Sequence, residues 1–174
     1  MELPEVVIRQ ARVQDAQVLA GAERAIAATP GFLVSQPAEL RDERFAEKIA
    51  ALAAADNGRY LVAEVDGKIA GHGMLDPLPF AAVRHVVHLT LAVHPGWQGR
   101  GVGRALLGRL IEWATAAPAV EKIELHVRSS NAVAQALYRK MGFTEVGRWR
   151  RRVKVAPDRY VDDVAMELCL TKTG

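Results

Sequence analysis

The chain has little cysteine and no long run of apolar residues. Its 174 residues include one cysteine, Cys169, so an internal disulfide is excluded. The sequence also lacks the Cys and His spacing of a zinc site, and we expect no metal. No apolar stretch approaches the length of a membrane span, and residues 1–5 lack the basic and apolar regions of a signal peptide. These absences favour a protein of the reducing cytoplasm with no membrane partner.

The remaining composition is that of an ordinary globular protein. Half of the residues are hydrophobic (50%) and a quarter are charged (25%), without an internal repeat or linker, which predicts one domain over residues 1–174. The net charge of +3 suits an anionic cofactor but does not require nucleic acid. The basic stretch 148–154 is interpreted as the solvated face of a strand, with coenzyme phosphates, an acidic partner or nucleic acid as alternatives. Nucleic acid is disfavoured because Trp149 is the one aromatic residue among these charges.

The most informative segment is the glycine-rich stretch at residues 93–107, which joins an apolar strand to an amphipathic helix. Its glycines alternate along the chain: Gly99, Gly101 and Gly103. Without Cβ atoms, such a loop presents consecutive N–H groups to a phosphate at a helix N-terminus. Arg100 and Arg104 add positive charge. The segment therefore predicts a pyrophosphate site, with a turn that binds no ligand as the alternative.

The spacing of these glycines distinguishes between known phosphate loops. Arg104 stands where a dinucleotide-binding loop has its third glycine, and no segment fits a nucleotide P-loop. Gln98, Gly101 and Gly103 fit the pattern [QR]-x-x-G-x-[GA]. This pattern resembles the coenzyme A pyrophosphate loop of the GNAT superfamily of acyl-CoA-dependent N-acetyltransferases.

A second segment, residues 131–147, is similar to another motif of that superfamily, N-x-x-A-x-x-L-Y-x-K-x-G-F-x-x-x-G. Every named position is filled, by Asn131, Ala134, Leu137, Tyr138, Lys140, Gly142, Phe143 and Gly147. A capped amphipathic helix would explain the asparagine and the first glycine, but it would not explain the tyrosine.

The hydrophobic periodicity predicts strands that alternate with helices. Strands are expected at 6–9, 60–65, 68–75, 85–93, 123–127, 143–153 and 160–169, and helices at 15–28, 38–55, 102–114 and from 131 onward. An Asp66-Gly67 turn is expected between two of the strands. This order predicts a layered α+β (α/β) architecture. The resemblance implies the GNAT fold, in which a mixed central sheet has helices on both faces and its parallel strands 4 and 5 splay apart.

The resemblance also implies an acetyl-CoA site. The expected cofactor-binding residues are the strand residues Leu91 and Val93, the loop and helix residues Gln98, Gly99, Arg100, Gly101, Val102, Gly103 and Arg104, and the later residues Asn131, Ala134 and Lys140. Tyr138 follows Asn131 by two helical turns, about 10 Å along the axis. The family assigns this tyrosine the protonation of the leaving thiolate, and a core tyrosine is the alternative.

The general base is the weakest part of the sequence-based site. Residues 85–93 hold no carboxylate, and their titratable groups are His85 and His88, which strand alternation places on opposite faces. We choose His88 as the candidate because it is nearer the acyl site, although either histidine could be structural. His94 precedes Pro95 in a turn, and we expect it to be solvated.

The acceptor is predicted from the C-terminal part. The run from Gly142 to Gly147, the basic strand and residues 159–166 resemble the L-amino acid N-acyltransferase and phosphinothricin acetyltransferase branch, whose members are often homodimers. An arginine would bind the substrate carboxylate, with Arg84, Arg128 and Arg151 as candidates. Loops 30–37 and 76–84 are expected to shape the pocket.

The sequence thus predicts a cytoplasmic N-acetyltransferase that moves the acetyl group of acetyl-CoA to the primary amine of a small molecule, such as an L-amino acid. One alternative is a protein or ribosomal-protein N-terminal acetyltransferase. Another is a non-catalytic acyl-CoA sensor, which Tyr138 disfavours. The expected partners are the small-molecule amine and a second copy of the chain.

Overall fold

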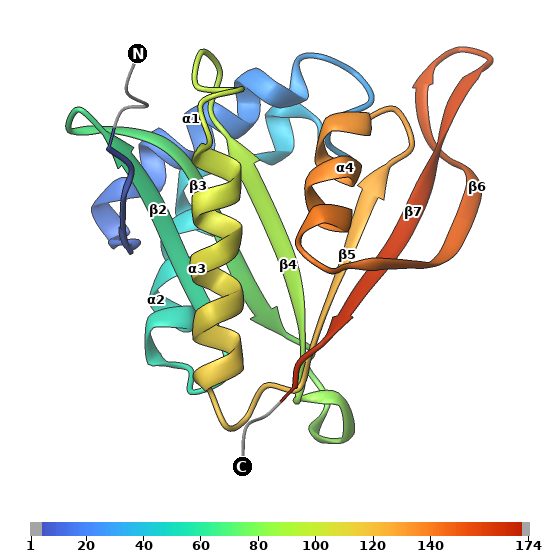
Figure 1. The fold of residues 1–174 in the computed structure, drawn as a ribbon. Helices are drawn as coiled ribbons and strands as arrows, with labels where there is room; N and C mark the ends of the chain where they lie inside the picture. The colour runs from blue at the N-terminus through green and yellow to red at the C-terminus, as the bar shows by residue number, and fades with distance from the viewer. Residues whose placement is uncertain (1–4, 172–174) are drawn as a thin grey trace.

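A computed structural model describes residues 5–171 and contains one mixed sheet of seven strands in the order β1-β2-β3-β4-β5-β7-β6 (Figure 1). The strands are β1 (Val7–Gln10), β2 (Arg59–Val65), β3 (Lys68–Pro77), β4 (Val86–Val93), β5 (Lys122–Arg128), β6 (Thr144–Ala156) and β7 (Arg159–Cys169). The helices are α1 (Ala16–Ala27), α2 (Asp42–Ala54), α3 (Val102–Ala116) and α4 (Ala132–Lys140). The predicted order of strands and helices is confirmed.

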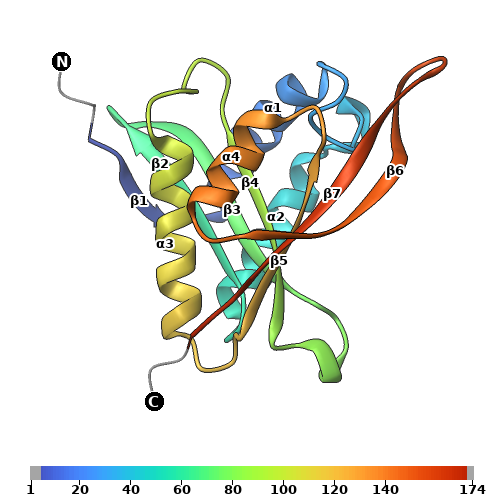
Figure 2. The same ribbon diagram turned by 45° about the vertical axis from the view of Figure 1, so that its right-hand side comes forward.

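Helices cover both faces of the sheet. Figures 1 and 2 show α3 and α4 on one face and α1 and α2 on the other. One apolar cluster joins α3, α4 and the sheet, and a second joins α1, α2 and the sheet. Val87 and Leu89 belong to the first cluster, so strand alternation turns the intervening His88 toward the face that carries α1 and α2.

The strands β4 and β5 are parallel and pair over a short distance. Their register joins Val86 to Lys122, Val87 to Ile123 and His88 to Glu124. Beyond these pairs the two strands diverge toward the end at which the loop before α3 begins (Figure 1). The predicted splay of strands 4 and 5 is therefore confirmed, and it opens the sheet beside the glycine-rich loop.

Three local predictions have clear outcomes. Asp66 and Gly67 turn with φ angles of 51° and 74°, as a tight hairpin requires. The basic stretch lies on β6, where residues 144–152 are all exposed, as a solvated strand predicts. The helix expected at 38–55 begins later, because Leu40 leaves the helical region with φ −93° and ψ 82°.

Among residues 5–171, no helix is both long and apolar enough to cross a membrane.

Candidate active site

The loop between β4 and α3 has the backbone that an anion site needs. Gly96, Gly99 and Gly101 have backbone φ angles of 84°, 73° and 79°, which residues other than glycine rarely adopt. A Cβ atom added at any of the three would meet no other atom within 4 Å. The space around the loop is thus open, and the backbone conformation accounts for these glycines.

The first turn of α3 completes this site. The first hydrogen bond into the helix runs from the Ala105 N–H to the Gly101 carbonyl at 3.0 Å. The N–H groups of residues 102–104 have no acceptor within the helix because they precede that bond. Together with the positive end of the helix dipole, they suit an anion such as a phosphate group.

The side chains of the loop have separate tasks. Gln98 Oε1 accepts a hydrogen bond from the Gly96 N–H at 2.9 Å, which stabilises the turn. The Arg100 guanidinium lies 5.2 Å from the centre of the Trp97 ring. Val102 is buried in the core and anchors the start of the helix. Its side chain is therefore not available to a ligand.

Helix α4 begins at Asn131, whose Oδ1 accepts a hydrogen bond from the Ala134 N–H at 3.1 Å. Gly103 marks the close approach of three elements, since an added Cβ would lie 3.2 Å from Val93 Cγ2 and 3.4 Å from Leu137 Cδ2. The start of α3 thus packs directly against β4 and α4. Lys140 is exposed in the last turn of α4, at the opposite end from Asn131.

Tyr138 is buried between α4 and the sheet, and its ring lies 5.7 Å from the ring of Phe143. Burial raises the pKa of its hydroxyl to about 12, and the positive charge of Arg128 offsets part of this effect. Arg128 is itself buried and forms an ion pair with Asp163 at 2.6 Å between Nη2 and Oδ1. The tyrosine therefore keeps its proton at neutral pH.

His88 begins a row of rings that we call the aromatic row: His88, His126 and Trp149. The centroids of His88 and His126 are 5.2 Å apart, and those of His126 and Trp149 are 4.7 Å apart. The guanidinium of Arg152 lies 5.6 Å from the Trp149 ring and extends the row. Burial and the neighbouring His126 lower the pKa of His88, which is therefore neutral at pH 7.

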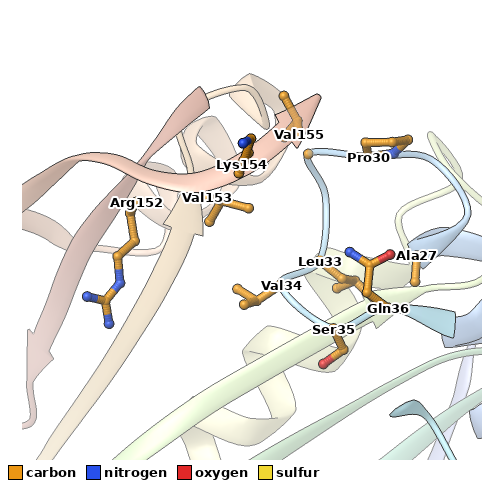
Figure 3. Close-up of a pocket in the computed structure, with 11 residues that line it drawn as sticks. Ala27, Pro30, Leu33, Val34, Ser35, Gln36, Arg152, Val153, Lys154 and Val155 are labelled. Carbon is orange, nitrogen blue, oxygen red and sulfur yellow. The ribbon is translucent and has the colours of Figure 1, made fainter. Parts of the chain in front are cut away.

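A pocket of about 280 Å³ has Arg152, which contacts the Trp149 ring, among its lining residues (Figure 3). It is formed between the loop after α1 and the strand β6, and it is lined by Ala27, Pro30, Gly31, Leu33, Val34, Ser35, Gln36, Arg152, Val153, Lys154 and Val155. Ser130 Oγ donates a hydrogen bond to the Gly31 carbonyl at 2.7 Å and fixes the loop against the start of α4. The pocket thus combines apolar walls with two cationic side chains.

Several expected positions differ in the structure. His94 is buried and hydrogen-bonded, so the prediction that it is solvated is wrong. His85 precedes β4 at the end remote from the glycine-rich loop. Arg84 pairs with Asp56 at 2.8 Å, also at that remote end, because the connection between β3 and β4 lies there (Figure 1). Residues 76–84 consequently do not line the pocket.

The remaining arginine candidates also have other contacts. The Arg151 guanidinium lies 4.4 Å from the Tyr160 ring, and Arg128 faces Asp163. Arg152, which lines the pocket, was missed by sequence reasoning, as was His126. The signal for His126 was its position in β5, two residues after Glu124, the register partner of His88. On parallel neighbours, positions of the same parity lie on the same face.

A pH prediction follows from the aromatic row. If His88 accepts the proton of the amine, kcat rises as pH rises through the lowered pKa of His88, below the ordinary histidine value of about 6.5. His126→Asn removes the neighbouring imidazole and should move this acid limb of the kcat profile upward. His85→Asn is the matched control and should leave the limb in place. An unchanged limb in His126→Asn would exclude the coupling of the two histidines.

Comparison with known proteins identifies the family of the chain. Residues 26–143 match the acetyltransferase (GNAT) family. The L-amino acid N-acetyltransferase AaaT of Escherichia coli is 31% identical over 162 residues, which are 92% of this chain and 95% of that protein. The N-alpha-acetyltransferase RimI of Mycobacterium tuberculosis is 36% identical over 107 residues, which are 59% of this chain and 63% of that protein.

Solved structures share the fold over nearly the whole chain. An acetyltransferase of the GNAT family from Streptococcus pneumoniae is 28% identical with a TM-score of 0.86, covering 96% of this chain and 100% of that chain. The yncA protein of Salmonella typhimurium, solved with its cofactor acetyl-CoA, is 24% identical with a TM-score of 0.86, covering 98% and 96%.

Proposed function

Because the chain belongs to the GNAT family of acetyltransferases, we propose that it transfers the acetyl group of acetyl-CoA to the primary amine of an L-amino acid or a similar small amine. The observation that supports an amino acid as the acceptor is the line of side chains that runs from Arg152 through the aromatic row to His88. It connects a cationic, apolar-walled pocket with the opening between β4 and β5. Residues 1–174 act as a single acetyltransferase domain in this proposal, in the cytoplasm.

The coenzyme is held by the loop and the two helices that flank the opening. The open glycine backbone and the first N–H groups of α3 bind the pyrophosphate, with Arg100 and Arg104 supplying charge. The backbone of Leu91 and Val93 pairs with the peptide-like pantetheine, because β4 has left β5 there. The remaining contacts come from α4 and its N-cap, at Asn131, Ala134 and Lys140.

When bound, acetyl-CoA supplies the activated acetyl thioester. Tyr138 and His88 approach the opening from opposite faces of the sheet, since Tyr138 belongs to the cluster under α3 and α4. His88 accepts the proton of the attacking amine on the pocket side. Tyr138 Oη donates a proton to the departing thiolate on the other side.

Arg152 is proposed to bind the carboxylate of the acceptor. The charge of the pocket favours an anion, because Arg152 and Lys154 line it and no carboxylate side chain is among the lining residues. The apolar side chains of Val34 and Val153 lie beside the same space (Figure 3) and suit an apolar substituent. An amino acid with an apolar side chain combines these features.

Thiol release from acetyl-CoA, measured with amino acids and with the corresponding amino acid amides, tests this proposal. We expect turnover with the amino acids, and Arg152→Gln should raise their KM by about 10- to 100-fold, as loss of a charge-assisted hydrogen bond predicts. The KM of the amides should change little. Arg150→Gln is the control, because Arg150 is exposed on β6 and does not line the pocket. Equal KM effects on both substrate series would contradict the carboxylate contact.

A second candidate is acetylation of protein N-termini, which the similarity to RimI favours. Adding short peptides to the same panel distinguishes the two, since turnover with peptides alone would select this candidate. Saturable binding of acetyl-CoA without turnover would indicate a sensor.

We also propose a homodimer formed along β6, where residues 144–152 are exposed and include Val146 and Trp149. Sedimentation equilibrium would give twice the chain mass of 18.9 kDa for a dimer and the chain mass for a monomer.

A further inference from the structure

Three side chains outside the proposed chemistry form a buried chain of contacts, which we call the Glu23–His72–His94 chain. His72 Nδ1 lies 2.9 Å from His94 Nε2, and His72 Nε2 lies 2.9 Å from Glu23 Oε1. The far nitrogen of His94, Nδ1, lies 3.1 Å from the Ile69 carbonyl. His72 is 1% exposed and His94 is 5% exposed. The Glu23–His72–His94 chain therefore joins α1, β3 and the residue after β4, with both histidines buried and Glu23 partly exposed.

The donors and acceptors of this chain can be assigned one after another. The Ile69 carbonyl only accepts, so His94 Nδ1 donates and its Nε2 carries a lone pair. His72 Nδ1 must then donate to His94 Nε2. The remaining contact, between His72 Nε2 and Glu23 Oε1, needs one further proton on either atom. Glu23 and His72 thus share one proton, and the pair is neutral overall.

The surroundings agree with this assignment. Burial and the neighbouring His72 lower the pKa of His94 to about 4, which keeps His94 neutral. Tyr60 on β2 lies with its ring 5.9 Å from that of His72, and burial and the charge of Glu23 raise the pKa of Tyr60. Phe45 on α2 closes the site, with its ring centroid 6.3 Å from that of His72 in an edge-to-face arrangement. The titratable groups that face His72 are therefore Glu23, Tyr60 and His94.

The two ends of the Glu23–His72–His94 chain lie at the two halves of the proposed active site. The His94 carbonyl accepts the Trp97 N–H at 3.1 Å, and the His94 N–H donates to the Ala70 carbonyl at 2.9 Å, so this residue fixes the first turn of the glycine-rich loop. Glu23 lies on α1 one turn before Ala27, which lines the acceptor pocket.

We propose that Glu23, His72 and His94 are positioning residues that hold the start of the coenzyme loop and couple it to α1 through one shared proton. Without that proton, the His72 Nε2 lone pair would face a carboxylate, and the contact would open. The loop would then lose its fixed start, and coenzyme A would bind more weakly. This inference rests on the assignment of residues 95–101 to the coenzyme.

Glu23→Gln tests the shared proton, because its amide can donate to His72 Nε2 while it cannot titrate. The dissociation constant of coenzyme A is measured by calorimetry for both proteins from about pH 5 to pH 9, which brackets ordinary carboxyl and imidazole pKa values. Ionisation of the coenzyme cancels in the ratio of the two constants. We expect the dissociation constant of the wild-type protein divided by that of Glu23→Gln to be near one at neutral pH. This ratio should rise at least about fivefold at the alkaline end, which is the lower limit of common coupling between sites. A ratio that is constant across the range would overturn the proposal.

Two variants of His72 separate the two contacts. His72→Asn retains a donor at the position of Nδ1 toward His94, and His72→Gln retains one at the position of Nε2 toward Glu23. Coenzyme A should bind His72→Gln more weakly than His72→Asn by at least about fivefold, because only His72→Gln removes the hydrogen bond to His94 Nε2. Equal affinities would contradict the proposal.

The tautomer of His94 can be measured in the wild-type protein and tests the assignment without any variant. Nitrogen-15 chemical shifts should show His94 protonated at Nδ1 and bare at Nε2, and the opposite tautomer would overturn the assignment. Wild-type protein that binds no coenzyme A at any pH would refute the coenzyme loop itself. Binding without the expected ratio would refute the coupling alone.

Discussion

Tyr138→Phe is expected to lower kcat by about 10²- to 10³-fold, within the usual contribution of a general acid. The substitution keeps the ring against Phe143 and removes the hydroxyl alone. The affinity for coenzyme A should therefore stay within about twofold, because the proposed proton transfer follows binding. Because the pKa of Tyr138 is about 12, the wild-type hydroxyl stays protonated between pH 6 and pH 10, and the loss should be constant over that range.

The measurement is steady-state thiol release, with coenzyme A binding by calorimetry. Tyr160→Phe is the matched control, since this tyrosine lies on β7 under Arg151 and should lose no activity. Unchanged turnover in Tyr138→Phe would remove the tyrosine from the mechanism. A large loss of coenzyme affinity would instead make it a structural residue.

Gly101→Val is expected to weaken coenzyme A binding by about 100-fold or more, the effect of losing about two charge-assisted hydrogen bonds. Gly101 has a φ angle of 79°, and a β-branched residue there forces the backbone away from this conformation at a cost of about 1–3 kcal/mol. The N–H groups at the start of α3 would then turn away from the pyrophosphate.

Gly67→Val is the control that separates the loss of coenzyme binding from the effect of backbone strain. Gly67 has a φ angle of 74° with no atom within 4 Å of an added Cβ, and it lies in the β2–β3 turn. The two variants should lose similar thermal stability, while Gly67→Val retains coenzyme affinity. Unaltered affinity in a folded Gly101→Val protein would contradict the pyrophosphate assignment.

The order of the elements could be predicted from the sequence because it depends on local patterns. Apolar periodicity located the strands and helices, and the Asp66-Gly67 turn followed from two residues. The glycine-rich turn was predictable for the same reason, since residues 96–104 are contiguous.

The contacts between distant segments could not be predicted in this way. His94 was expected in solvent because it precedes Pro95 in a turn. It is buried because His72 and Ile69, more than 20 residues earlier, supply partners for both ring nitrogens. The pocket likewise joins residues 27–36 to residues 152–155, and neither segment carries a motif that predicts its contact with the other.

The divergence of β4 from β5 gives the sheet an internal edge. From Leu89 to Val93, β4 pairs with β3 on one side, while the register with β5 has already ended at His88. Exposed edges of sheets invite pairing with strands of other proteins, which leads to aggregation. This edge lies inside the sheet, on which α3 and α4 cover one face and α1 and α2 the other (Figure 2). The fold thus keeps a hydrogen-bonding edge within its own sheet, where a slender peptide-like chain such as pantetheine can pair with it.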